Sequence, residues 1–286
     1  MKNIIEIENL VKKYDDSFEL NINSLKLKSG TVIGLIGENG AGKTTLIKSI
    51  LGIINKDCGK IKIFGEESDR KAEDIKENIG LVLDNIFFPE VLTPSDINLI
   101  MKDIYKNWDM PLFLKYLKDF KLEPKKKIKT FSKGMRKKLE IATALAHHPK
   151  LLILDEATSG LDPVVRGEVL DIFLDFIQDE EHTILFSTHI TSDLESIADQ
   201  IIFMDKGKVI LNQRRDEIID QHGVLKCDIN DFEKIEKEDI IRYRKNKYDY
   251  EILIKDRDKI KKKYKNFIVD KISIDELMIL MIKGEK

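Results

Sequence analysis

A glycine-rich octapeptide at residues 37–44, Gly-Glu-Asn-Gly-Ala-Gly-Lys-Thr, constrains the fold of this chain more than any other feature. It satisfies the pattern G-x-x-x-x-G-K-[ST] at every defined position. The apolar run at residues 32–36 precedes it, as expected of a strand covered on both faces, and a helical pattern begins at about residue 43. Strand, glycine-rich turn and helix in this order predict a loop that binds a phosphate group.

The residues of this loop have chemistry suited to a nucleotide. Glycines let the backbone wrap closely around phosphate, and successive N–H groups form a nest at the positive end of the helix. Lys43 is predicted to reach the β- and γ-phosphates, and the Thr44 hydroxyl to bind Mg²⁺. The alternative, a glycine-rich turn that binds nothing, is disfavoured by the complete spacing. The predicted nucleotide-binding residues of the loop are Gly37, Asn39, Gly40, Ala41, Gly42, Lys43, Thr44 and Thr45.

A second apolar run, at residues 151–154, ends in two carboxylates, Asp155 and Glu156. Asp155 is predicted to hold the hydration shell of Mg²⁺, and Glu156 to polarise a water for attack on the γ-phosphate. Ordinary surface acids at a strand end are the alternative, and the glycine-rich loop upstream disfavours it. The sequence therefore predicts a Mg-dependent ATPase whose cofactors are ATP and Mg²⁺.

The pattern of apolar residues predicts an α/β fold. Buried strands are expected at residues 32–36, 79–83, 151–154 and 183–186, with helices between them, as in a parallel sheet. Alternating apolar and polar residues at 2–8 and 17–27 predict antiparallel strands. We expect an ATPase domain at residues 1–215 with a helical subdomain at about 89–149, and a small α+β appendage at 216–286.

Composition excludes some classes of function. The chain has 286 residues and a net charge of −2, which does not indicate a nucleic-acid partner. Its two cysteines lie far apart in the sequence and predict neither a disulfide framework nor a metal-ligand pair. We find no signal peptide and no apolar run long enough for a membrane helix. The chain is expected to be soluble by itself, with any membrane spans supplied by another chain.

Four further features resemble the ABC ATPase family. The segment Phe-Ser-Lys-Gly-Met-Arg at residues 131–136 is similar to the ABC signature, usually Leu-Ser-Gly-Gly-Gln. Residues 159–162 match the D-loop, and residues 187–189 match the H-loop. Tyr14 stands where the family has an aromatic residue that stacks on adenine. The resemblance extends over about residues 3–215, with the motifs in the family's order.

This resemblance implies a P-loop NTPase (RecA-like) core with an antiparallel β subdomain and an inserted helical subdomain. It implies a homodimer or heterodimer of ATPase subunits, in which each ATP lies between the glycine-rich loop of one chain and the signature of the other. Ser132, with Lys133 and Gly134, would contact the γ-phosphate across the interface. Catalysis would use Lys43, Glu156 as the general base and His189 to place the water, and Asp162 would join the two sites.

The resemblance also implies integral membrane permease subunits as partners, and hence a position at the cytoplasmic face of the membrane. It places the surface that docks on them within residues 85–105. No nucleic-acid partner is implied.

The sequence departs from the family pattern at two places. Lys133 and Met135 replace the second Gly and the Gln of the signature, and Asp84 occupies the position of a Gln that senses the metal. These changes, with Phe88-Pro89 and the run at residues 92–94, resemble a subgroup of Gram-positive ABC exporter ATPases for peptides and antibiotics, such as the exporters of phenol-soluble modulins. The subgroup implies that ATP hydrolysis powers export. The alternatives are an importer ATPase, and a soluble ABC ATPase or nucleotide-dependent regulator without a transport role.

Overall fold

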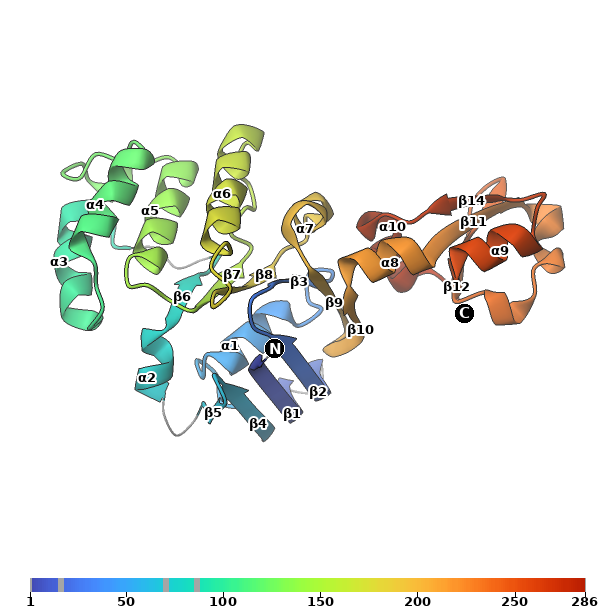
Figure 1. Ribbon diagram of the computed structural model, residues 1–286, viewed down its shortest axis with the longest axis horizontal. Helices are drawn as coiled ribbons and strands as arrows, with labels where there is room; N and C mark the ends of the chain where they lie inside the picture. The colour runs from blue at the N-terminus through green and yellow to red at the C-terminus, as the bar shows by residue number, and fades with distance from the viewer. Residues whose placement is uncertain (1, 15–17, 69–71, 85–87, 286) are drawn as a thin grey trace.

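The computed structural model describes residues 2–14, 18–68, 72–84 and 88–285. The described residues form an elongated molecule in which helices α3, α4 and α5 lie at one end and a small sheet with helices α9 and α10 lies at the other (Figure 1). Two larger sheets occupy the middle. None of the helices in these ranges is long and apolar enough to cross a lipid bilayer.

The central sheet has the strand order β10-β9-β3-β8-β7-β6. Its strands are β3 (Val32–Ile36), β6 (Ile79–Val82), β7 (Leu151–Asp155), β8 (Thr183–Ser187), β9 (Gln200–Asp205) and β10 (Lys208–Arg214). All neighbours are parallel except β9 and β10, which form a hairpin. Every residue of β3, β7 and β8 is buried, which explains their nearly unbroken apolar sequences. The predicted α/β fold is confirmed.

Helices cover both faces of this sheet. On one face α1 (Lys43–Ile50) packs in a cluster with strands of the central and the antiparallel sheet. On the other face α5 (Lys133–Leu145), α6 (Pro163–Phe176) and α7 (Thr191–Ile197) bury Ile141, Phe173 and Leu194 in a second cluster. Because parallel strands need crossover connections, this arrangement brings the carboxyl ends of β3, β7 and β8 to one edge of the sheet.

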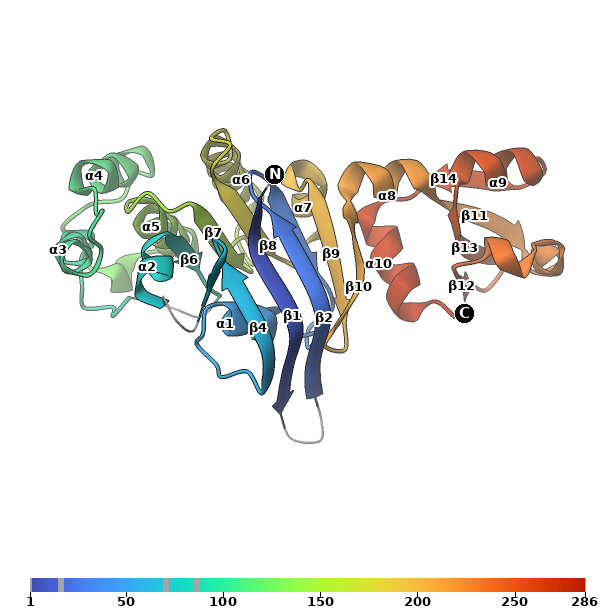
Figure 2. The same cartoon turned by 60° about the horizontal axis from the view of Figure 1, so that its bottom comes forward.

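The antiparallel sheet has the order β2-β1-β4-β5. It consists of β1 (Asn3–Tyr14), β2 (Phe18–Lys28), β4 (Cys58–Ile63) and β5 (Glu66–Glu67). Figure 2 shows the long strands β1 and β2 side by side. The first strand runs beyond the predicted end at residue 8, because its pairing with β2 continues to Tyr14. The register with β4 shifts between Glu8 and Val11, where Asn9 has φ of 50°.

The helical region contains α3 (Pro94–Ile104), α4 (Met110–Asp119), a short 3₁₀ turn (Ile128–Thr130) and α5, while α2 (Ala72–Glu77) precedes β6. Helix α3 begins at a capping box in which Thr93 and Asp96 satisfy each other's backbone N–H groups, and Pro94 occupies its first turn. Ile97, Phe113 and Leu139, from the three helices, share one buried apolar cluster.

The C-terminal region forms a third sheet with the order β12-β13-β11-β14. Its elements are α8 (Arg215–Gln221), β11 (His222–Asp228), 3₁₀ segments (Ile229–Lys234 and Lys237–Asp239), β12 (Arg242–Lys245), β13 (Asp249–Lys255), α9 (Arg257–Lys263), β14 (Ile268–Lys271) and α10 (Ile274–Lys283). Leu277 and Leu280 of α10 join the cluster that contains Leu194 of α7, and the Ile274 N–H donates to Glu195 at 2.8 Å. The apolar core therefore includes residues on both sides of residue 215. The division into two domains at this residue stays a prediction.

Candidate nucleotide-binding site

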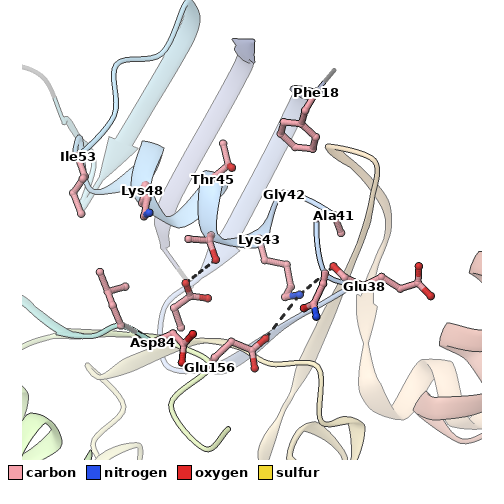
Figure 3. Close-up of a pocket in the computed structure, with 15 residues that line it drawn as sticks. Phe18, Glu38, Ala41, Gly42, Lys43, Thr45, Lys48, Ile53, Asp84 and Glu156 are labelled. Carbon is pink, nitrogen blue, oxygen red and sulfur yellow. Dashed lines mark hydrogen bonds and ion pairs between the residues drawn. The ribbon is translucent and has the colours of Figure 1, made fainter. Parts of the chain in front are cut away.

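A pocket of about 660 Å³ lies where the carboxyl ends of β3 and β7 meet the N-terminus of α1. Residues 38–45 of the glycine-rich loop form one wall, and Asp84, Asp155 and Glu156 form another. Figure 3 shows Lys43 and Glu156 pointing toward each other, with Phe18 beyond Gly42. The structure thus brings the two predicted motifs together, although more than one hundred residues of sequence separate them.

The glycines of the loop are required by close contacts and by backbone conformation. Gly37 does not line the pocket; a Cβ on it would lie 2.4 Å from the carbonyl oxygen of Met204. Gly42 has φ of 104°, and a Cβ there would lie 2.9 Å from the ring of Phe18. Glycine tolerates both the close approach of neighbouring atoms and a positive φ. The loop can therefore turn between β9 and β2 and present its N–H groups at the start of α1.

Lys43 is held inside this loop. Its Nζ donates to the carbonyl oxygens of Gly37 at 2.7 Å and Glu38 at 3.3 Å, and lies 3.9 Å from Glu156 Oε1. Burial lowers the pKa of Lys43, and the neighbouring carboxylates of Glu156 and Asp155 oppose that shift. The ammonium group is therefore already positioned where an anion would bind.

Thr44 and Asp155 interact directly. The Thr44 hydroxyl donates to Asp155 Oδ2 at 2.8 Å, and Asp155 is only 2% exposed. The other carboxylate oxygen, Oδ1, is buried without a hydrogen-bond partner among the described residues. A buried, unsatisfied carboxylate oxygen is costly unless a donor or a cation binds it.

Glu156 and His189 are brought together by adjacent parallel strands. Glu156 follows β7 and has φ of 53°, and its N–H donates to the Ser187 carbonyl of β8 at 2.8 Å. His189 follows β8, and its Nδ1 lies 2.7 Å from Glu156 Oε2. Left-handed backbone at a non-glycine residue is uncommon and costs conformational free energy, and such residues cluster at functional sites. It directs the Glu156 side chain into the pocket, between His189 and Lys43.

Phe18 lines the pocket and Tyr14 does not, while the predicted stacking of Tyr14 on adenine stays a prediction. Tyr14, at the end of β1, is 41% exposed and is absent from the pocket wall, whereas Phe18, at the start of β2, lines it. The two ring centroids are 6.4 Å apart. Sequence reasoning missed Phe18 because it starts a strand and its ring could equally belong to the core.

A second hollow, of about 340 Å³, contains the predicted residues of the signature and the D-loop. It is lined by Ser132, Lys133, Gly134 and Asp162, with Gly160 and Leu161 among their neighbours. Ser132 caps α5 by accepting the Met135 N–H at 3.2 Å, and Asp162 caps α6 by accepting two N–H groups at 3.1 Å. No described residue lines both this hollow and the first pocket.

Lys133 lies over Gly160 in this hollow. A Cβ built on Gly160 would lie 2.3 Å from the Lys133 Nζ, so the missing side chain leaves the space that the lysine occupies. The hollow therefore combines a helix N-terminus with an exposed ammonium group, and both favour an anion.

A buried carboxylate, Asp193 of α7, forms hydrogen bonds that connect the loop after β7 and helix α6 to α7. It accepts hydrogen bonds from Thr158 at 2.6 Å and from Arg166 Nε at 2.5 Å, and is 1% exposed. Thr158 follows Glu156 in the same loop, Arg166 lies on the helix that Asp162 caps, and Asp193 lies just beyond His189. Sequence reasoning missed this network because its members are distant in sequence and each is a common surface type.

Comparison with known proteins agrees with this geometry. A family model described as ABC transporter matches residues 20–159. The bacitracin transport ATP-binding protein BcrA of Bacillus licheniformis is 35% identical over 213 residues, which is 73% of this chain and 69% of that protein. The lantibiotic transport ATP-binding protein SrtF of Streptococcus pyogenes is 35% identical over 216 residues, 74% of this chain and 92% of that protein. The chain belongs to the ABC transporter ATP-binding family.

Other members of the ABC family extend the comparison. The ABC transporter ATP-binding protein YtrB of Bacillus subtilis is 28% identical and covers 99% of both chains, including the C-terminal region. A solved ATP-binding subunit of an ABC transporter has a TM-score of 0.68 at 27% identity, over 75% of this chain and 91% of that one. CbiO1 of Clostridium perfringens, part of the ABC transporter complex cbiONQ, has a TM-score of 0.62 at 28% identity, over 76% and 91%.

Membership in the ABC family confirms the predicted P-loop NTPase core and means that the domain binds ATP and is of an ATPase family. The first pocket contains the glycine-rich loop, Asp155 and Glu156, and His189 contacts it through Glu156. The second hollow contains the signature and the D-loop. The roles of the individual residues stay predictions.

Proposed function

We propose that this chain hydrolyses ATP in two composite sites of a dimer and thereby powers the export of amphipathic antimicrobial peptides through separate membrane subunits. The observation that carries the proposal is the separation of the two hollows. One holds the glycine-rich loop and the catalytic carboxylate, and the other holds the signature Ser132 at a helix N-terminus.

Each hollow has half of the groups that a triphosphate requires. The first supplies Lys43, backbone N–H groups and Glu156, and the second supplies the N-terminus of α5 with Ser132 and Lys133. A second copy in head-to-tail orientation would set its signature against the open side of the first pocket. The γ-phosphate would then be bound by Lys43 from one chain and by Ser132 from the other.

The catalytic groups of the first pocket are already in contact. Glu156 is the proposed general base, because its carboxylate lies beside the proposed γ-phosphate position marked by the Lys43 ammonium. His189 orients this carboxylate by donating from its Nδ1. When both ring nitrogens carry a proton, Nε2 can in addition donate to the γ-phosphate. Thr158 and Asp193 restrain the two loops that carry these side chains.

The residues around Asp155 fit a magnesium ion. Hydroxyl and carboxylate oxygens are the ligands that Mg²⁺ prefers, and the unsatisfied Oδ1 of Asp155 is such an oxygen. Thr44, Asp155 and Asp84 would hold the ion, which neutralises phosphate charge when bound. Among the described residues no group of three or more His, Cys, Asp or Glu side chains could hold a metal ion. Phosphate oxygens and water would therefore complete the shell.

The relatives support export of peptides, and an exposed apolar surface supports docking on a membrane subunit. BcrA and SrtF are named bacitracin and lantibiotic transport proteins. Four large apolar side chains around α3 are 42% to 70% exposed. They are Val91, Leu99, Ile100 and Ile104. We propose that this surface docks on the membrane subunit at the cytoplasmic face; residues 85–87 of the predicted docking segment lie outside the described residues.

The composite site is tested by trapping the dimer. With Mg²⁺ and ATP, Glu156→Gln protein should sediment as a dimer, because ATP binds and hydrolysis is blocked. Adding Ser132→Arg in that background should keep the protein monomeric while ATP still binds. Glu181→Gln, at an exposed acid, is the matched control and should leave the dimer intact. A Glu156→Gln protein that binds ATP and stays monomeric would refute the proposal.

Transport is tested in cells. Removal of this chain should increase retention of bacitracin-type peptides, and the unaltered chain, but not Glu156→Gln, should restore their release. Reduced peptide uptake on removal would favour the importer alternative, and unchanged peptide handling would favour a regulator.

A further inference from the structure

Helix α5 contains a buried ion pair next to the nucleotide pocket. Lys137 and Glu140 are 4% and 8% exposed, and Lys137 Nζ lies 2.7 Å from Glu140 Oε2. The same ammonium donates to the Leu83 carbonyl oxygen at 3.2 Å. Burying two charges costs about as much as their attraction returns, so such a pair contributes little net stability and its geometric specificity is the more informative property.

The two ends of this contact belong to different halves of the proposed ATP site. Leu83 and Asp84 line the first pocket, at the end of β6. Ser132, which lines the second hollow, caps the same helix that carries Lys137 about one and a half turns later. Lys137 therefore connects the wall of this chain's nucleotide pocket to the signature, which in the proposed dimer would bind the nucleotide of the partner chain.

Charges near the pair also include Asp84. Burial raises the pKa of Glu140, Lys137 opposes that shift, and the negative charge of Asp84 adds to it. Asp84 thus lies within electrostatic reach of the pair. A displacement of the Asp84 segment when nucleotide binds would change the balance of charge around Lys137 as well as its contact with Leu83.

The helix is held tightly enough to transmit such a displacement. A Cβ on Gly80 of β6 would lie 2.6 Å from the Ala144 carbonyl oxygen of α5, so the two elements pack backbone to backbone. With its C-terminal half against β6 and Lys137 attached to the Leu83 carbonyl, α5 is restrained at two places. A movement of residues 83–84 would therefore be passed to Ser132 as a shift of the helix N-terminus.

We propose that Lys137 is a positioning residue that couples the nucleotide pocket of one chain to its own signature, and so couples the two ATP sites of the dimer. The inference rests on the proposed function. Through this coupling, ATP binding at one site favours assembly of the other site. We therefore expect the hydrolysis rate to depend on ATP concentration with a Hill coefficient approaching two.

The test separates coupling from stability with two variants. Lys137→Met alone leaves the Glu140 charge buried and unpaired, which lowers the thermal unfolding midpoint strongly. Lys137→Met with Glu140→Met removes both charges, and we expect it to regain the unfolding midpoint of the unaltered protein within a few degrees. The matched control replaces both members of an exposed pair, Lys150→Met with Glu181→Met.

Two quantities are measured as a function of ATP concentration: the hydrolysis rate, and the dimer fraction in the Glu156→Gln background by sedimentation. We expect a Hill coefficient of about two for the unaltered protein and the exposed-pair control, and of about one for the double Met variant. The maximal rate of the double variant should fall less than tenfold, since Lys137 contacts neither phosphate nor the attacking water.

Several outcomes would overturn the inference. A double Met variant that keeps a Hill coefficient of two would show that Lys137 has a structural role alone. An unaltered protein that dimerises with ATP but responds without cooperativity would leave no coupling for Lys137 to carry. Failure of the Glu156→Gln protein to dimerise at all would instead refute the proposed function, so the two failures are distinguishable.

Discussion

The two halves of the proposed ATP site hold their charged groups in different ways. In the first pocket Lys43 is 6% exposed and already bound to carbonyl oxygens, and Glu156 is bound to His189. In the second hollow Ser132 and Lys133 are exposed, and the open end of α5 has no such enclosure. The pocket is preorganised by contacts within the chain, whereas the hollow presents groups to an external anion. Under the proposed function, the groups for catalysis are held in place within one chain, and a partner chain would complete the site.

The largest effect should come from the preorganised half. Glu156→Gln should lower kcat by roughly 10²- to 10⁴-fold, because the amide cannot accept a proton from the attacking water. Phosphate release under saturating Mg²⁺ and ATP measures the change. Glu181→Gln, at an exposed acid, is the control and should be unaffected. Residual turnover above one-tenth would mean that another group is the base.

The next effect distinguishes the halves most sharply. Lys43→Ala should weaken ATP binding to the isolated monomer by up to about 100-fold, since a charge-assisted hydrogen bond contributes roughly 1.5–3 kcal/mol. Ser132→Ala should leave monomer binding unchanged and weaken only dimer formation. Equilibrium binding of a fluorescent ATP analogue, at protein concentrations below dimerisation, measures both. If both variants lost ATP affinity in the monomer to the same extent, the proposed difference between the pocket and the hollow would be wrong.

A smaller effect is expected at the network behind the pocket. Asp193→Asn should reduce kcat about tenfold with little change in KM, because the Glu156 and His189 loops lose a shared restraint while the phosphate-binding groups stay in place. Steady-state kinetics separates the two constants, and circular dichroism checks folding. A rise in KM with unchanged kcat would assign Asp193 to nucleotide binding instead.

The smallest effect should come from the open half. Lys133→Met should raise the ATP concentration needed for dimerisation by about two- to fivefold, because an exposed charge contributes less than about 1 kcal/mol. The difference should shrink in high salt, where exposed charges are screened. Lys129→Met, an exposed lysine just before the signature, is the control. A salt-independent effect would indicate that Lys133 acts through its packing on Gly160.

Contiguous motifs were predictable from sequence because their geometry is local. The glycine-rich loop follows from residues whose φ angles and close approaches require glycine, and from a strand and a helix adjacent in sequence. Roles for Thr44, Asp155 and Glu156 were predicted from their motifs, and the role of His189 from the resemblance to the ABC family. The pairs Thr44–Asp155 and Glu156–His189 form because the ends of parallel strands share one edge of the sheet. Their contacts needed the strand order, with β7 beside β8 and β8 beside β3.

Residues whose role depends on burial were not predictable. Lys137 and Glu140 resemble any polar pair at i, i+3 on a helix surface, and Asp193 resembles any acid in a first helical turn. Packing of α5 on β6, and of α6 and α7 on the sheet, removes these groups from water. Phe18 likewise became a pocket residue only because Gly42 lies against its ring.

The fold class and the phosphate loop could be read from the sequence, and candidate catalytic side chains could be predicted from it, because these depend on neighbours along the chain. The packed fold shows which charges are buried, which strand ends meet, and that the signature and the loop face different hollows. The physical reason is that desolvation and through-space contact are properties of the packed chain, and residues far apart in sequence set them jointly.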